Sequence, residues 1–193
     1  MHEPVSLRAA IDTFSDVDGW TDAEARRRRH NSARMFFNDG QVRSQVPVSR
    51  GKTALYGPPG VLVLRFVLFA HEAGLNRAFV AAMSDWLHGA DTDLAHPSPD
   101  ELNKVRSLAN RAEGAVTRME AGERIALVCD HHSRWSFQFD PPPVQSDMDE
   151  QVAEVLADDA IASPVEPAPL RVRFHLDKIV RPVFDRLAGE SEA

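Results

Sequence analysis

The chain has 193 residues, and its 43% hydrophobic and 26% charged content is that of one medium-sized globular protein, not of a fibrous or disordered one. The single cysteine, Cys129, excludes an intrachain disulfide framework and predicts a reducing, cytoplasmic setting. We expect neither a secretory signal nor a membrane partner, because the longest apolar run, residues 60–70, is too short to span a bilayer and contains Arg65.

The net charge of −7 is distributed unevenly along the chain. Residues 25–66 contain nine arginines and lysines and one acid, Asp39, whereas residues 137–170 contain eight acids and no basic residue. Phosphate binding depends on the face that meets the phosphates and not on the net charge. The basic segment therefore makes nucleic acid a candidate partner, although the sequence pI is about 5.6.

The first elements predicted along the chain are two short helices. A capping box at Thr21 and Glu24 predicts a helix over residues 21–30, which contains four consecutive arginines. The pair Asn31–Ser32 then provides candidate caps, so we predict a second helix over residues 32–40.

A small β-hairpin and two further helices are predicted next. Residues 41–56 alternate apolar and polar side chains around a turn, with Arg50 and Lys52 at its tip. Residues 58–74 form an apolar helix that is opened by prolines and stopped by glycine, and residues 77–88 have apolar side chains at helical spacing.

Residues 90–99 have the composition of a linker, and residues 100–120 predict a helix with a heptad seam. The seam residues are Leu102, Val105, Ala109, Ala112, Val116 and Met119. Two readings stay open: this seam pairs two chains in a homodimer, or the helix packs on its own domain.

The remaining residues predict a small β-containing region. Residues 124–139 form two short strands around a "DHHS" turn, residues 140–169 are an acidic, proline-rich linker, and residues 170–193 form a strand followed by a helix. The fold class expected from all these elements is α+β, mainly α.

The order of the elements over residues 20–88 resembles the MerR-type winged helix-turn-helix domain. The resemblance rests on Tyr56 at the end of the hairpin, on the apolar spacing of residues 61–67 and on the pair Gly74–Leu75. The cluster at residues 35–37 stands near the position of an arginine–aromatic–aromatic element in that family. The sequence departs from the family between the first two helices, where "RRRRHNS" replaces an apolar turn, and it lacks the family's metal-binding cysteines.

This resemblance implies a winged helix-turn-helix DNA-binding domain over residues 1–89, with the helix-containing region 100–139 as a dimerisation unit. We therefore predict a cytoplasmic transcriptional regulator with double-stranded DNA as its partner, homodimeric, and with RNA polymerase as a further candidate partner. The predicted DNA-binding residues are Arg26, Arg27, Arg28, Arg29, Asn31, Ser32, Arg34, Arg43, Arg50 and Lys52. The alternative reading of the arginine run is a solvated charged surface.

Two other functions remain open: an excisionase-like accessory protein of phage type, and a protein-interaction module on the same fold. We predict no catalytic residues, no cofactor and no metal site. Cys129, His131 and His132 form the nearest approach to a metal-ligand cluster, but adjacent strand residues point to opposite faces. His88 and His96 are expected to be exposed to solvent.

Overall fold

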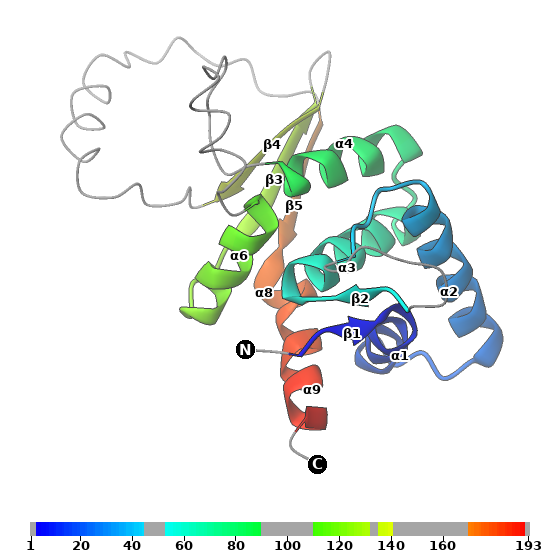
Figure 1. The fold of residues 1–193 in the computed structure, drawn as a ribbon. Coiled ribbons are helices and arrows are strands. Elements are labelled where there is room, and N and C mark those ends of the chain that lie inside the picture. The colour runs from blue at the N-terminus through cyan, green and yellow to red at the C-terminus, as the bar shows by residue number, and fades with distance from the viewer. Residues whose placement is uncertain (1–2, 45–52, 90–109, 132–134, 141–169, 192–193) are drawn as a thin grey trace, which may run out of the picture.

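The structure is a computed structural model that describes residues 3–44, 53–89, 110–131, 135–140 and 170–191 (Figure 1). It confirms the predicted class, α+β with mainly helical structure. The helices are α1 (Leu7–Val17), α2 (Ala23–Asn38), α3 (Pro58–Glu72), α4 (Arg77–His88), α6 (Arg111–Glu120), α8 (Leu176–Ile179) and α9 (Arg181–Ser191). The strands are β1 (Val5–Ser6), β2 (Leu55–Tyr56), β3 (Ala126–His131), β4 (Trp135–Asp140) and β5 (Leu170–His175).

Helix α1 precedes the first helix that the sequence analysis predicted. The Ser6 side chain caps it by accepting a hydrogen bond from the Ala9 N–H at 3.2 Å. Its buried face includes Ala10, Ile11 and Phe14, at the spacing of one helical stripe. A short turn with a positive φ at Gly19 then leads into α2, so α1 and α2 are two helices joined by a turn of about five residues.

Helix α2 is continuous from Ala23 to Asn38, and the predicted break at Asn31–Ser32 is wrong. The cap is Asp22, whose carboxylate accepts from the Ala25 N–H at 2.8 Å. Asn31 is exposed, so its amide can be hydrated in mid-helix at no burial cost. No glycine or proline interrupts the segment, and the helix continues because its core-facing side chains stay in register.

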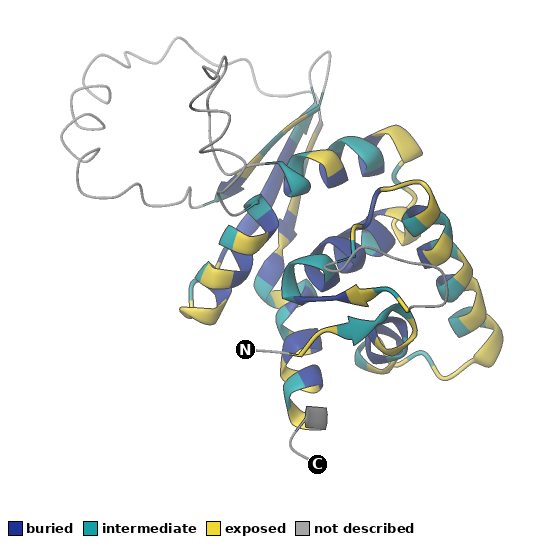
Figure 2. Ribbon diagram, in the orientation of Figure 1, coloured by how far each residue is buried: buried dark blue, intermediate teal, exposed yellow. Residues whose placement is uncertain are grey.

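Helix α3 lies at the centre of the molecule and is buried from Val61 to Leu68, as Figure 2 shows. It is apolar on nearly all sides, as a helix enclosed by its neighbours must be. Its neighbours are α2, α4 and α6. The predicted proline start and the predicted following helix, α4, are both confirmed.

The first strand of the predicted hairpin lies largely outside the described residues, so its pairing with residues 54–56 stays a prediction. Among the described residues, strand β2 pairs antiparallel with β1, with Val5 opposite Tyr56 and Ser6 opposite Leu55. Residues 45–52, which include the predicted tip at Arg50 and Lys52, lie outside the described residues.

The second sheet has the strand order β4-β3-β5, all antiparallel, and confirms the predicted hairpin and C-terminal strand. The register places Leu127 opposite both Phe139 and Phe174 on the face that meets the helices. The Phe79 ring of α4 lies 4.5 Å from that of Trp135 and 5.8 Å from that of Phe137, between ring centroids. Aromatic contacts therefore fix this sheet against α4.

The dimer seam is wrong for the residues that the structure describes. Ala112, Val116 and Met119 are buried within the chain, where α6 packs against α3. These side chains are already covered by the protein's own core, which agrees with the alternative reading of a helix packed on its own domain. Leu102, Val105 and Ala109 lie outside the described residues.

One hydrophobic core joins segments that the sequence analysis assigned to separate regions. Ile11 of α1, Val116 of α6 and Val183 of α9 belong to the same cluster of buried residues. In Figure 1 the C-terminal helix α9 lies beside α1, and the two helices are in contact. Within the described ranges, no helix combines the length and the apolar character needed to cross a membrane.

Candidate nucleic-acid interface

Arg29, one of the four consecutive arginines, belongs to the protein interior. Its side chain is 1% exposed and makes a two-point ion pair with Glu72 of α3, with both N–O distances at 2.6 Å. A second carboxylate, that of Asp18, lies 2.8 Å from the Arg29 guanidinium, and the Trp20 ring stacks against it at 3.7 Å. Arg29 therefore cannot contact DNA, and its assignment as a DNA-binding residue is wrong.

Asp18 also pairs with Arg65 of α3, which is buried although it interrupts an apolar run. The Arg65 guanidinium donates to Asp18 Oδ2 at 2.7 Å and to the Ile179 carbonyl of α8 at 3.1 Å. Burial alone would raise the pKa of Asp18, but the hydrogen bonds and charges of Arg65 and Arg29 outweigh it and lower that pKa. The network fixes the α1–α2 turn to α3 and α8, and thereby sets the rotation of α2.

Two more of the four arginines are paired on the surface. Arg26 donates to the Trp20 carbonyl at 2.7 Å and to Asp16 at 2.5 Å, and its side chain is 30% exposed. Arg28 pairs with Glu24 one helical turn earlier, at 3.0 Å. Such exposed pairs contribute little stability, so both guanidiniums can exchange their carboxylate for a phosphate.

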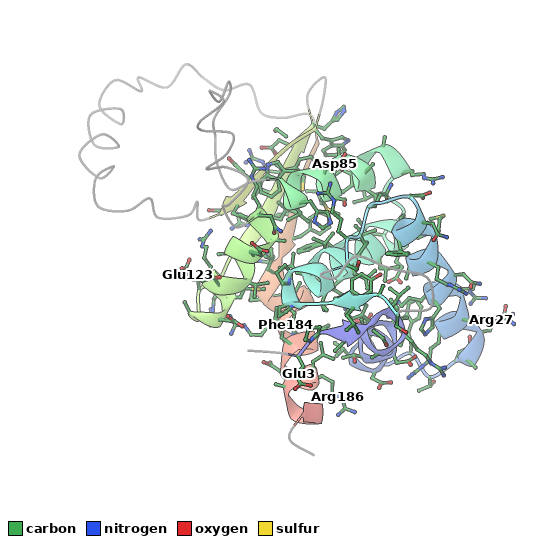
Figure 3. All side chains as sticks on the ribbon, in the orientation of Figure 1. Glu3, Arg27, Asp85, Glu123, Phe184 and Arg186 are labelled. Carbon is green, nitrogen blue, oxygen red and sulfur yellow. The ribbon has the colours of Figure 1, made fainter. Side chains whose placement is uncertain are left out.

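The outward face of α2 carries Arg27, Asn31 and Arg34. Their spacing of four and three residues places them on one stripe, and all three are exposed. The opposite stripe is the buried one, formed by Arg29, Ala33 and Phe36. Figure 3 shows Arg27 pointing away from the other helices. Within the part of the chain that the structure describes, Arg27 and Arg34 have neither an ion pair nor a hydrogen bond.

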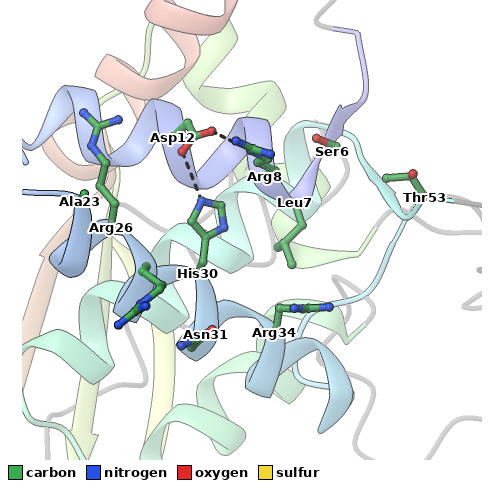
Figure 4. A pocket seen from close by; sticks show the side chains of 11 residues that line it. Ser6, Leu7, Arg8, Asp12, Ala23, Arg26, His30, Asn31, Arg34 and Thr53 are labelled. Carbon is green, nitrogen blue, oxygen red and sulfur yellow. Dashed lines mark hydrogen bonds and ion pairs between the residues drawn. The ribbon is translucent and has the colours of Figure 1, made fainter.

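A groove of about 820 Å³ runs between this face of α2 and the start of α1 (Figure 4). Its lining side chains are Ser6, Leu7, Arg8, Asp12, Ala23, Arg26, Arg27, His30, Asn31, Arg34 and Thr53. Four arginines face one carboxylate, that of Asp12, which already holds His30 at 3.2 Å and Arg8 at 3.7 Å. The groove is therefore net positive.

The other predicted DNA-binding residues do not join this groove. Ser32 is half-buried on α2 and does not line the groove, and Arg43 lines a separate cavity next to His88. Arg50 and Lys52 lie outside the described residues, although Thr53, which follows them, is in the groove wall.

Sequence reasoning missed the contribution of α1 to the groove. A helix in this segment was predictable from the sequence, because Ser6 is a good N-cap. The apolar residues that follow recur at helical spacing, with steps of three, one and three: Leu7, Ala10, Ile11 and Phe14. A helix predicted there would have placed Arg8 and Asp12 one turn apart on its polar side.

Within the described residues, the groove presents two guanidiniums without an ion pair, those of Arg27 and Arg34, together with the exposed amide of Asn31, so it can bind a polyanion and can present donors and an acceptor to base edges. In contrast, the described residues bring together no group of three or more histidine, cysteine, aspartate or glutamate side chains suited to a metal ion. Comparison with protein-family models and with curated proteins gave no match. The function therefore has to be inferred from this geometry.

Proposed function

We propose that the protein is a transcriptional regulator that binds duplex DNA through α2, with Arg27, Asn31 and Arg34 turned toward the major groove. The observation that carries the proposal is the exposed stripe of these three residues, directly opposite the buried stripe of the same helix. An α-helix fits the major groove of B-form DNA, and a helix that enters it must carry its polar readers on the side away from its own core.

The neighbouring elements support a helix-turn-helix arrangement. Helix α1 comes before α2 across a short turn, and in such proteins the first helix crosses the DNA backbone while the second reads the groove. The buried network of Asp18, Arg29 and Arg65 holds the turn rigid, which is what groove reading requires. The strand β2 beside β1, followed by α3 and α4, is compatible with a MerR-like winged domain.

The groove residues divide by chemistry into two classes. Arg8, Arg26 and Arg28 lie at or beside the groove in surface ion pairs, and we assign them to phosphate contacts that position the protein. Arg27, Asn31 and Arg34 are the base readers, because arginine matches guanine and asparagine matches adenine through paired hydrogen bonds.

A homodimer remains part of the proposal, since two half-sites improve discrimination against genomic competitors. It cannot use the buried residues of α6 as its seam. Leu55 is the one large hydrophobic side chain exposed among the described residues, so their surface offers no broad apolar contact.

The proposal is tested by titrating the protein against labelled duplex DNA over a range of salt concentrations. The double variant Arg27→Ala/Arg34→Ala removes two base readers, so the affinity for a selected site should fall by about 1 to 3 kcal/mol per residue, while the log–log salt slope, which reports phosphate contacts, should stay nearly unchanged. The matched control is Arg124→Ala/Lys178→Ala, which removes two exposed cations from the side of β3 and α8. Equal losses in both double variants, or none in the first, would refute binding through α2.

A further inference from the structure

Asp12 carries the one carboxylate among the residues that line the groove between α1 and α2. Its Oδ1 atom lies 3.2 Å from His30 Nε2, and its Oδ2 atom lies 3.7 Å from Arg8 Nε (Figure 4). Arg8 belongs to α1 and His30 to α2. An anionic group of the protein itself therefore occupies the place where donors from the two helices converge.

The hydrogen bond between Asp12 and His30 has a definite direction. An ionised carboxylate can only accept hydrogen bonds, so Nε2 of His30 carries a proton and donates it to Asp12 Oδ1. The free oxygens of a phosphodiester are also acceptors only. One of them can replace Asp12 Oδ1 on the same N–H without any change of tautomer.

Both contacts of Asp12 are open to solvent. The side chain of Arg8 is 87% exposed, and those of Asp12 and His30 are 44% and 25% exposed. Ion pairs of this kind contribute little stability, because water and salt screen them. A phosphate that enters the groove can therefore take over both donors at small cost, while the Asp12 carboxylate returns to water.

His88 does not offer a comparable site, although it borders a second cavity. The prediction that His88 is exposed to solvent is wrong, because its Nε2 atom is buried where α4 ends. His96, which was also expected to be exposed, lies outside the described residues. Among the described histidines, His30 is the one that lines the arginine-rich groove.

We propose that Arg8 and His30 form a phosphate subsite, and that Asp12 occupies this subsite in the free protein and competes there with the DNA backbone. As a DNA contact, the subsite rests on the proposed function, to which it adds one phosphate ligand and one internal competitor. Phosphate contacts position a protein but carry no sequence information. Asp12 therefore lowers the affinity for every duplex alike, whereas sequence preference stays with the base readers.

The competition is tested with the full chain and two labelled duplexes of unrelated sequence, over a range of salt concentrations. Asp12→Asn removes the charge and keeps the side-chain shape. We expect it to bind both duplexes about three- to tenfold more tightly at low salt, with a log–log salt slope steeper by roughly one unit. The matched control is Glu120→Gln, which removes an exposed carboxylate at the end of α6, outside the groove, and should bind as the wild type does. No gain in Asp12→Asn, a gain on one duplex only, or an equal gain in the control overturns the proposal.

The double variant Arg8→Ala/His30→Ala tests whether Asp12 acts through these two donors. Adding Asp12→Asn to this background should raise the affinity by less than about twofold, because the subsite that Asp12 occupies is gone. A gain as large as in the wild-type background would mean that Asp12 acts only as a nearby charge, and would overturn the assignment of Arg8 and His30.

Pyrophosphate separates the subsite from DNA binding. Histidine ring signals in NMR are followed during titration, with His30→Ala used to assign the His30 signal. A saturable shift of that signal is expected, with at least about threefold tighter binding in Asp12→Asn. If pyrophosphate behaves in this way but neither duplex binds, the phosphate subsite stands and the proposed function fails. If the duplexes bind but pyrophosphate leaves His30 unchanged and Asp12→Asn has no effect, the subsite fails and the proposed function stands.

Discussion

Four neighbouring arginines with the same side chain have three different roles in this protein. Arg29 is a buried structural cation, Arg26 and Arg28 are surface ion-pair partners, and Arg27 is unpaired among the described residues. Successive residues turn by about 100° around a helix, so the four side chains cannot all face the same way. The sequence alone does not say which arginine is buried, since the answer depends on Glu72, 43 residues away.

Substitution of Asp18 measures how much the buried network contributes to the stability of the fold. Replacing Asp18 with Asn leaves Arg29 and Arg65 with less negative charge around them, and the free energy of unfolding should fall by about 3 kcal/mol at pH 7. Urea denaturation followed by circular dichroism measures this loss. The exposed control Asp185→Asn should change stability by less than about 0.5 kcal/mol.

The pH dependence of the same pair has a definite sign. The folded-state pKa of Asp18 is lower than its ordinary value of 3.8, so the unfolded chain takes up a proton at higher pH than the folded protein does. The ionised Asp18 carboxylate therefore contributes fully to the free energy of unfolding above about pH 5, and this contribution is lost as the pH falls through the folded-state pKa. The difference in the free energy of unfolding between the wild type and Asp18→Asn should shrink below pH 4. A difference that stays constant with pH would exclude a stabilising role for the Asp18 carboxylate.

At the scale of elements, the sequence predicted helices well where apolar spacing and terminal signals agree. Helices α3 and α4 have prolines or asparagine at the start and glycine at the end, and both were placed correctly. The predicted break within α2 was wrong. Asn31 and Ser32 have side chains that often cap helices, but such residues also occur in mid-helix, and here the tertiary contacts of Ala33 and Phe36 keep the helix continuous.

Replacement of Asn31 by alanine is expected to stabilise the fold and to weaken sequence-specific DNA binding. Asn31 is exposed in mid-helix, so Asn31→Ala should raise the free energy of unfolding by about 0.5 kcal/mol through helix propensity. As a base reader, however, its loss should cost about 1 to 3 kcal/mol of discrimination between the preferred site and its single-base variants. Binding to a selected site and to its single-base variants gives the second quantity. A variant that keeps full discrimination removes Asn31 from the reading face.

On the scale of the whole molecule, helices and strands from distant parts of the sequence share one core. The sequence suggested several separate regions because residues 90–99 and 140–169 have linker composition, and composition does not report which elements pack together. The pairing of β1 with β2 was equally hidden, since each strand has two residues and no periodicity to read.

This shared core changes what a charge in the predicted dimer seam would do. Val116 is 6% exposed and lies on α6, which packs against α3, so Val116→Asp should destabilise the protomer by about 3 kcal/mol through an unpaired buried charge. Thermal unfolding should show a lower midpoint, with light scattering on the remaining folded protein reporting the wild-type mass. Thr117→Asp, one residue further and exposed, is the control. A lower mass in light scattering without a lower unfolding midpoint would instead support the predicted dimer seam on this helix.

The contact between α9 and α1 has a consequence for the order in which the protein becomes functional during translation. Three residues of α9, Val183, Phe184 and Leu187, are buried in the core that also holds Ile11 and Phe14. Helix α1 can therefore complete its packing only after residues more than 160 positions later in the chain have been synthesised. Until then the arginine-rich helix α2 has no fully packed neighbour at the α1 side. The packed arrangement of α1 against α2 is therefore expected to be complete only after synthesis has passed α9.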